Sequence, residues 1–124
     1  MDYEFEACRV IPVLEIITGK WKPLILRHLI KGGTKRFSEL RSLMPEITQR
    51  MLTLHLRELE EQHIVKRNVY AQVPPKVEYS ITEHGLTLEP VLAVMNEWGT
   101  KHLQFMQEME LEKRAEENEI LNFD

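Results

Sequence analysis

The sequence predicts a mainly helical α+β protein that carries a small β-hairpin. Three observations lead to this fold class. Apolar residues recur at helical spacing over most of the chain, two short segments near its middle alternate between apolar and polar residues, and prolines and glycines separate these segments. The chain has 124 residues, of which 43% are hydrophobic, so it can form one packed core and is too short for two ordinary domains.

Two helices are predicted in the first third of the chain. The first begins at Pro12, which suits the first turn of a helix, and ends at Gly19. The second begins at Pro23 and ends at the glycine pair 32–33. The second helix carries a wide apolar face, and Trp21, between the two helices, is expected to be a core anchor.

Two further helices follow at close spacing. The shorter one covers residues 38–44, with Ser38 as its N-cap and Pro45 directly after its end. Thr48 is the N-cap of a longer helix, which runs through about residue 63. Two helices joined by so tight a turn do not pack antiparallel with ease, so we predict a helix-turn-helix.

The pattern then changes from helical to strand-like and back. Residues 65–69 and 77–81 alternate with a period of two, and a proline pair lies between them, which predicts a β-hairpin with a stiff tip. Thr82 is the expected N-cap of a last helix. The apolar spacing of this helix continues past Trp98, despite the glycine that follows.

The charge of the chain is divided unevenly. The net charge of −4 taken alone argues against nucleic acid, but residues 20–76 carry +7 and the remaining residues carry −11. This division has two interpretations: an ordinary solvated surface, or a basic face that binds a polyanion between acidic ends.

The helix after Thr48 has two distinct faces. Leu52, Leu56 and Leu59 fall on one side and predict the buried stripe. The residues in the roughly opposite sector are either the solvated side of an amphipathic helix or a surface that enters the major groove of DNA. They are Gln49, Arg50, Thr53 and Arg57.

In a DNA complex these side chains have suitable chemistry. Gln49 can hydrogen-bond to base edges, Arg50 can bind guanine or phosphate, and Thr53 can contact a thymine methyl group. Other residues would position the duplex without reading its sequence. The full predicted DNA-binding set is Lys35, Arg36, Ser38, Thr48, Gln49, Arg50, Thr53, Arg57 and Lys76.

Several other classes of protein are disfavoured. The single cysteine, Cys8, excludes a disulfide framework and fits a reducing compartment, so we expect a cytoplasmic protein. Neither a membrane span nor a signal peptide is indicated. The five histidines lack the spacing of a zinc pair, and no phosphate loop or nucleophile motif is present, so we expect no metal, no cofactor and no enzymatic activity.

Eight short motifs occur in order and at compatible spacing over residues 8–103. They are Cys8, Gly19-Lys20-Trp21, Ile25-Leu26, Arg36-Phe37-Ser38-Glu39-Leu40, Thr48-Gln49-Arg50-Met51-Leu52-Thr53, Leu56-Arg57-Glu58-Leu59-Glu60, Val73-Pro74-Pro75-Lys76-Val77-Glu78-Tyr79 and Trp98-Gly99. Together they resemble the HxlR family of winged-helix transcriptional regulators. The resemblance implies a homodimer that forms through its terminal helices and binds a pseudo-palindromic operator in double-stranded DNA, as a repressor or an activator.

This organisation assigns residues 1–107 to a winged helix-turn-helix domain for DNA binding and dimerisation. Residues 108–124 form an acidic tail that is either a helical extension or disordered. The apolar positions of the last helix either pack against the first helix or form the dimer interface, and one helix can do both. The predicted interface residues are Leu88, Leu92, Met95, Trp98, Leu103 and Met106.

Cys8 stands where many members of the resembled family carry a cysteine, which in some of them senses oxidants or electrophiles. Arg9 stands where proline is common, and Pro12 is an unusual interruption. Arg9 and a helix N-terminus would favour the thiolate, whereas Glu4 and Glu6 would oppose it. For Cys8, the alternatives to sensing are an inert, buried cysteine and a regulator with a signal that is not thiol-based. For the whole protein, the alternative is a winged-helix module that binds protein.

Overall fold

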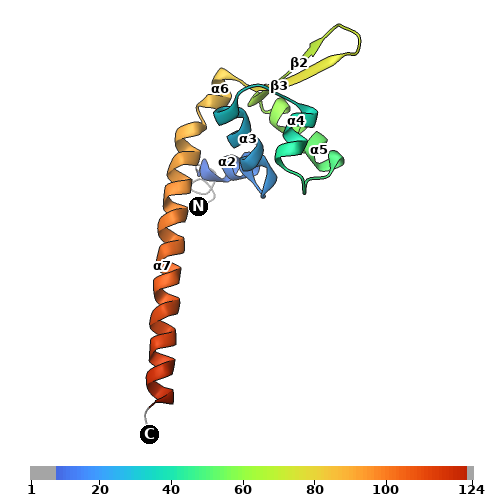
Figure 1. The fold of residues 1–124 in the computed structure, drawn as a ribbon. Helices are drawn as coiled ribbons and strands as arrows, with labels where there is room; N and C mark the ends of the chain where they lie inside the picture. The colour runs from blue at the N-terminus through green and yellow to red at the C-terminus, as the bar shows by residue number, and fades with distance from the viewer. Residues whose placement is uncertain (1–7, 123–124) are drawn as a thin grey trace. The chain divides into compact units, whose positions relative to one another are not determined.

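The computed structural model describes residues 8–122 and divides after Glu89 into two units. The first unit holds a set of short helices and a small sheet, and the second is formed by one long helix (Figure 1). The elements are α2 (Val10–Ile17), α3 (Trp21–Gly32), β1 (Lys35–Arg36), α4 (Phe37–Leu43), α5 (Gln49–Glu61), β2 (Val65–Tyr70), β3 (Lys76–Ile81), α6 (Glu83–Leu86) and α7 (Glu89–Leu121).

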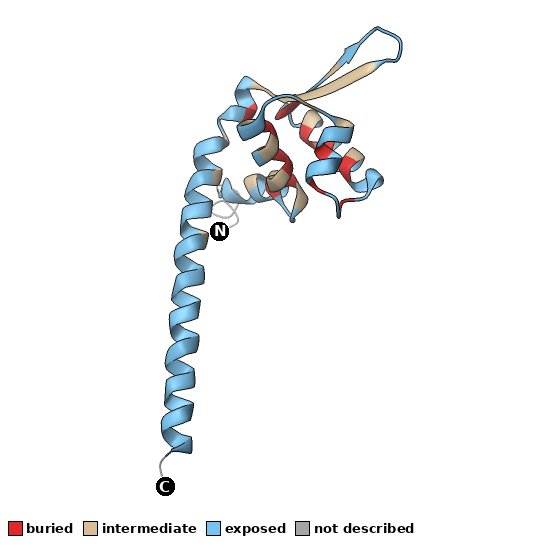
Figure 2. Ribbon diagram, viewed as in Figure 1, coloured by how far each residue is buried: buried red, intermediate tan, exposed pale blue. Residues whose placement is uncertain are grey.

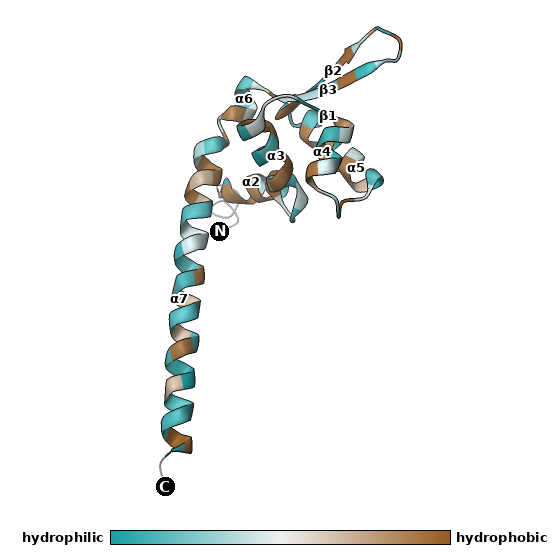
Figure 3. Ribbon diagram, viewed as in Figure 1, coloured by the Kyte–Doolittle hydropathy of each residue, from teal (hydrophilic) through white to brown (hydrophobic). Residues whose placement is uncertain are grey.

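The core of the first unit confirms the predicted helix-turn-helix with its hairpin. Buried side chains concentrate on the facing sides of α3, α4 and α5 (Figure 2). Figure 3 shows hydrophobic and hydrophilic residues interspersed along these helices, and Leu43 and Leu54 are apolar residues that are exposed. The most deeply buried apolar residues are Ile25, Leu26, Leu29, Leu40, Ile47, Leu52, Leu56, Leu59 and Val65.

The two helices of the helix-turn-helix begin differently. Thr48 caps α5 as predicted, because its hydroxyl oxygen accepts a hydrogen bond of 3.1 Å from the Met51 backbone N–H. The prediction that Ser38 caps α4 is wrong, since the helix begins at Phe37 and Arg36 is its N-cap. The Glu39 carboxylate reaches back to accept the Arg36 N–H at 2.9 Å, which is the half of a capping box that the residue at N3 supplies.

The sheet has three antiparallel strands in the order β1-β3-β2. The β2–β3 hairpin was predicted, and its register pairs Val65 with Ile81 and Tyr70 with Lys76. The sequence analysis missed β1, which pairs Lys35 with Tyr79 and Arg36 with Glu78. This third strand joins the start of α4 to the β2–β3 hairpin, which is the wing. The helix-turn-helix and the wing are therefore connected through one sheet.

The predicted last helix is two helices, separated by a turn at residues 87–88. Thr82 does cap a helix, but this is the short α6, where its hydroxyl accepts the Gly85 N–H at 2.8 Å. The Thr82 N–H donates to the Ile64 carbonyl oxygen at 3.1 Å, and a Cβ on Gly85 would lie 2.2 Å from that oxygen. This close packing holds α6 in place. Pro90 is tolerated only near the start of a helix, so α7 begins anew at Glu89.

The second unit is helical from residue 90 through Leu121. The helix continues past Gly99, as predicted, and includes residues 108–121 of the acidic segment. None of the described residues of α7 is buried. Whether residues 108–124 act as a separate tail stays a prediction.

Candidate DNA interface

The outward face of α5 is the first part of the candidate interface. Arg50 and Arg57 are exposed, and Gln49 at the N-terminal end of the helix is exposed as well. Thr53 is half-buried, and its hydroxyl donates a hydrogen bond of 2.8 Å to the Gln49 carbonyl oxygen. Because the helix uses this proton internally, the Thr53 side chain offers an acceptor oxygen and a methyl group to a ligand.

The sequence analysis overlooked Leu54 on the same face. Successive residues of an α-helix are rotated by about 100°, which places Leu54 opposite the centre of the stripe formed by Leu52, Leu56 and Leu59. Leu54 is 49% exposed, whereas each of the three stripe residues is at most 1% exposed. Helical rotation alone predicts the outward position of Leu54, although only polar residues of this face were predicted to contact DNA.

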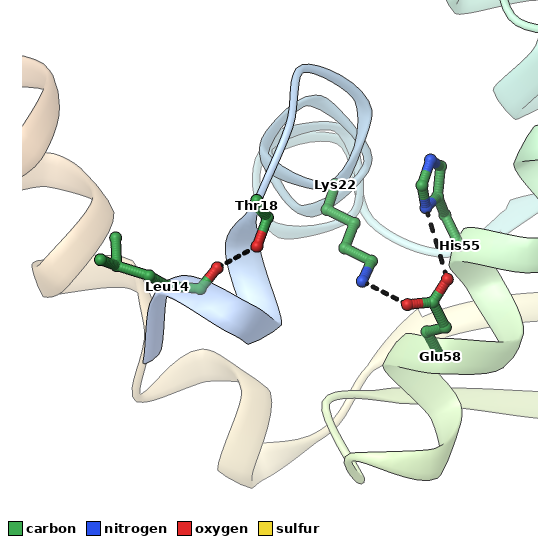
Figure 4. A network of polar contacts seen from close by, with 5 residues as sticks. All are labelled: Leu14, Thr18, Lys22, His55 and Glu58. Carbon is green, nitrogen blue, oxygen red and sulfur yellow. Dashed lines mark hydrogen bonds and ion pairs between the residues drawn. The ribbon is translucent and has the colours of Figure 1, made fainter. Parts of the chain in front are cut away.

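A partly buried ion pair joins α5 to α3. The Lys22 Nζ atom lies 2.7 Å from Glu58 Oε2, with the lysine side chain only 8% exposed (Figure 4). A second contact, between the Thr18 hydroxyl and the Leu14 carbonyl oxygen, lies nearby on α2. The pair neutralises the carboxylate on the flank of α5, and removal of the Glu58 carboxylate would leave the buried Lys22 charge without its partner.

His55 lies beside this pair. Its Nδ1 atom is 3.8 Å from Glu58 Oε1, and it is buried without a hydrogen-bond partner. Burial lowers the pKa of His55 below 6.5, the Lys22 charge lowers it further, and Glu58 partly opposes both effects. The neutral imidazole is therefore favoured at neutral pH, and His55 adds no positive charge to α5.

The β2–β3 hairpin carries exposed cations that the predicted site did not include. The Nζ atom of Lys76 lies 2.7 Å from Glu78 Oε1 and 5.2 Å from the centre of the Tyr70 ring, so this lysine already has intramolecular partners. Lys66 and Arg67 on β2 are exposed and were not selected from the sequence. Both residues lie in the basic segment 20–76, which the sequence shows. Their exposure could not be predicted, because it depends on the register of the hairpin.

The remaining predicted DNA contacts lie around the start of α4. Arg36 and Ser38 are exposed, whereas Lys35 is half-buried and its Nζ atom donates to the Gly32 carbonyl oxygen at 2.7 Å. Thr48 is exposed at the start of α5, where its hydroxyl caps the helix. The first unit thus presents two kinds of basic side chain. Those on α5 and β2 are exposed, whereas Lys35 on β1 and Lys76 on β3 bond to groups within the chain.

Cys8 is a free, exposed cysteine two residues before the first residue of α2. Glu4 and Glu6, which were expected to oppose thiolate formation, lie outside the described residues. Among residues 8–122, no group of three or more His, Cys, Asp or Glu side chains is arranged to hold a metal ion. Over the same residues, no helix combines the length and apolar character needed to cross a membrane.

The α7 helix carries an exposed apolar seam. Its members alternate at steps of four and three residues, which is the spacing of a coiled-coil seam. Trp98 is 65% exposed, and its ring stacks on His102 with a centroid distance of 5.0 Å. Of the predicted interface residues, Leu88 lies in the turn before α7, Leu92 is half-buried, and Met95, Trp98, Leu103 and Met106 are exposed. The seam consists of Val91, Met95, Trp98, His102, Phe105 and Met109.

Known proteins are similar to this chain in sequence and in fold. The family described as HxlR-like helix-turn-helix matches residues 16–107. The HTH-type transcriptional regulator YdeP of Bacillus subtilis is 55% identical over 120 residues, which cover 94% of this chain and 93% of YdeP.

Two solved structures are similar to this chain in fold and in sequence. The redox regulator HypR in its reduced form superimposes with a TM-score of 0.73 and 55% identity, covering 80% of this chain and 97% of HypR. Diamide-treated YodB of B. subtilis gives a TM-score of 0.67 and 35% identity, covering 77% of this chain and 93% of YodB. With its helix-turn-helix and its three-stranded wing, the chain belongs to the HxlR-like helix-turn-helix family of transcriptional regulators.

Proposed function

We propose that this protein is a sequence-specific transcriptional regulator of the cytoplasm that acts on double-stranded DNA without enzymatic activity or a cofactor. The observation that carries the proposal is the two-faced α5 helix, with Arg50 and Arg57 exposed opposite a fully buried leucine stripe. In winged helix-turn-helix proteins the second helix of the motif enters the major groove, and the hairpin lies along the flanking DNA. The YdeP relative, named as an HTH-type transcriptional regulator, supports this proposal.

Each predicted contact then has a role. Gln49 and Arg50, at the start of α5, reach base edges, and Thr53 contacts a thymine methyl group. The others bind or position the phosphate backbone, to which the exposed wing cations Lys66 and Arg67 also contribute. These backbone contacts are Lys35, Arg36, Ser38, Thr48, Arg57 and Lys76.

The α7 seam supports the proposal that the protein is a homodimer. An isolated helix has little stability in water unless an amphipathic face packs against something, and none of the described residues of α7 is buried. A second copy of α7 would cover the seam with a matching surface and set two α5 helices on one duplex. The short α2 helix offers further apolar surface, since Val10 is 61% exposed and Leu14 is 48% exposed.

Selection of bound duplexes from a random pool by the full chain tests this function. We expect an enriched inverted repeat with half-site centres about one helical turn, or a multiple of it, apart, because a two-fold dimer presents two α5 helices. Failure to enrich any sequence, together with capture of a protein partner that depends on Arg50 and Arg57, would support the protein-binding alternative instead.

Replacement of Lys76 by alanine is expected to weaken all duplexes to a similar degree. A lysine that neutralises a phosphate releases about one counterion, so the slope of log affinity against log salt should become shallower by about one. Titrations of the selected operator and of a scrambled duplex at several salt concentrations measure this slope. Lys113→Ala on α7 is the matched control. An unchanged slope would mean that the Lys76–Glu78 ion pair persists in the complex.

We also propose that Cys8 is a thiol sensor, since its side chain is exposed and the similar HypR is named a redox regulator. Treatment with diamide is expected to release the operator from the wild-type protein and not from Cys8→Ser. Mobility-shift titrations with and without diamide, followed by reduction with dithiothreitol, measure the effect. Release that persists in Cys8→Ser would rule out this sensor.

A further inference from the structure

Leu54 is an exposed apolar side chain on the outward side of α5, beside Arg50 and Arg57 at the edge of the surface that the proposed function places in the major groove. It is 49% exposed, although it belongs to a helix whose other side is fully buried. Thr48 fixes the start of α5, so Leu54 lies in the second turn of the helix, where the side chains of such helices still reach base edges. Its position therefore gives it access to bases.

The surroundings of Leu54 indicate what kind of partner it contacts. Its neighbours on the helix surface lie three and four residues away, and two of them are Arg50 and Arg57, both exposed. A third, Met51, is apolar and 39% exposed. The fourth, Glu58, is the one carboxylate among them, and it is paired with Lys22 at 2.7 Å. An apolar centre between two cations matches a partner that has an apolar group between anionic groups.

Duplex DNA presents this combination in its major groove. The C5-methyl group of thymine is the apolar group on the base edges there, and phosphates border the groove on both sides. We propose that Leu54 reads a thymine through its methyl group, while Arg50 and Arg57 hold the flanking guanine or phosphates. The inference rests on the proposed function and deepens it, because it assigns part of the sequence specificity to an apolar contact.

Replacement of thymine by uracil tests this contact at the level of one methyl group. Each thymine of the operator selected by the wild-type chain is changed singly to uracil, and the dissociation constant is measured for each duplex. Removal of a methyl group from an apolar contact is expected to weaken wild-type binding about fourfold at the thymine that Leu54 contacts. Leu54→Ala should bind the thymine and uracil duplexes equally at that position.

Three further variants make the test specific. Leu54→Met keeps an apolar contact and should retain the preference for thymine. Leu54→Gln should lose this preference. If circular dichroism shows that Leu54→Ala is unfolded, Leu54→Gln replaces it in the test. Thr53→Ser removes the methyl group of the neighbouring predicted thymine reader. It should change the uracil response at a different base pair and leave the Leu54 position unchanged.

The possible failures can be told apart. If the wild-type chain selects an operator but the Leu54→Ala and Leu54→Gln variants show the same uracil responses as the wild type, the Leu54 inference is overturned and the proposed function stands. The same holds if no thymine of the operator responds to uracil. If the wild-type chain selects no sequence from the pool, the proposed function fails and the inference fails with it.

Discussion

A variant with Met95→Lys and Trp98→Lys is expected to be a monomer and to bind its operator roughly a hundredfold or more weakly than the wild type. Both residues belong to the exposed seam of α7, with 45% and 65% of their area exposed. Lysines at adjacent seam positions would bring four positive charges together across a two-fold interface. The two α5 helices would then bind their half-sites as separate molecules and lose the gain from linkage.

Sedimentation velocity measures the mass of this variant, and fluorescence anisotropy measures its operator affinity. Leu111→Lys is the matched control, because Leu111 is 64% exposed on α7 but lies outside the seam. Circular dichroism should show the same helical content in all three proteins if only the association is affected. A dimer of unchanged mass in the double variant would place the interface elsewhere.

The second large effect is expected from Arg50→Ala. A well-placed arginine that bonds to a guanine contributes about 1–3 kcal/mol of discrimination against the wrong base pair. Loss of this side chain should reduce the preference for the operator over single-base variants at one position in each half-site. Because Arg50 is exposed and has no role in the core, the stability of the protein should be nearly unchanged.

Binding of the wild type and Arg50→Ala to a set of operators with every single-base substitution measures this preference. Arg41→Ala is the control, since Arg41 is an exposed arginine on α4 that is not among the predicted contacts. Uniform weakening at all positions would assign Arg50 to a phosphate. Identical profiles for Arg50→Ala and the wild type would remove Arg50 from the interface.

Most of the fold could be predicted from the sequence because its elements have strong local signals. The leucine stripe of α5, the Thr48 cap and the alternation of β2 and β3 all depend on residues that are close along the chain. The β1 strand has only two residues and is defined by its pairing with β3, more than 40 residues away. Such a strand has no local pattern, and its prediction requires knowledge of the tertiary fold.

Several helix boundaries differ from the prediction. The helices α2 and α3 begin at Val10 and Trp21, each two residues before the predicted proline, and the boundaries of α4 and α6 differ for chemical reasons. The Glu39 side chain and the Arg36 N–H together begin α4, and this alternative to a serine cap becomes evident only when the first turn is seen. At α6, Gly85 packs so closely on the Ile64 carbonyl that the helix is held in place and the chain turns after it. A continuous helix would have satisfied the sequence pattern equally well.

Some features of the candidate site could likewise be predicted from the sequence, and others could not. The position of Arg50 and Arg57 on the outward side of α5 follows from helical rotation and the buried leucines. The pairing of Lys22 with Glu58 joins residues 36 positions apart, so it could not be read from the chain. The outward position of Leu54 follows from the same helical rotation, whereas its 49% exposure is known only from the structure.

The central claim is that the outward face of α5 reads DNA sequence. The most direct measurement is the ratio of dissociation constants of the full chain for a scrambled duplex and for its selected operator, at one physiological salt concentration. The account predicts a ratio of about a thousand or more for the wild type, with a clear reduction in Arg50→Ala. A ratio near one for the wild type would contradict it.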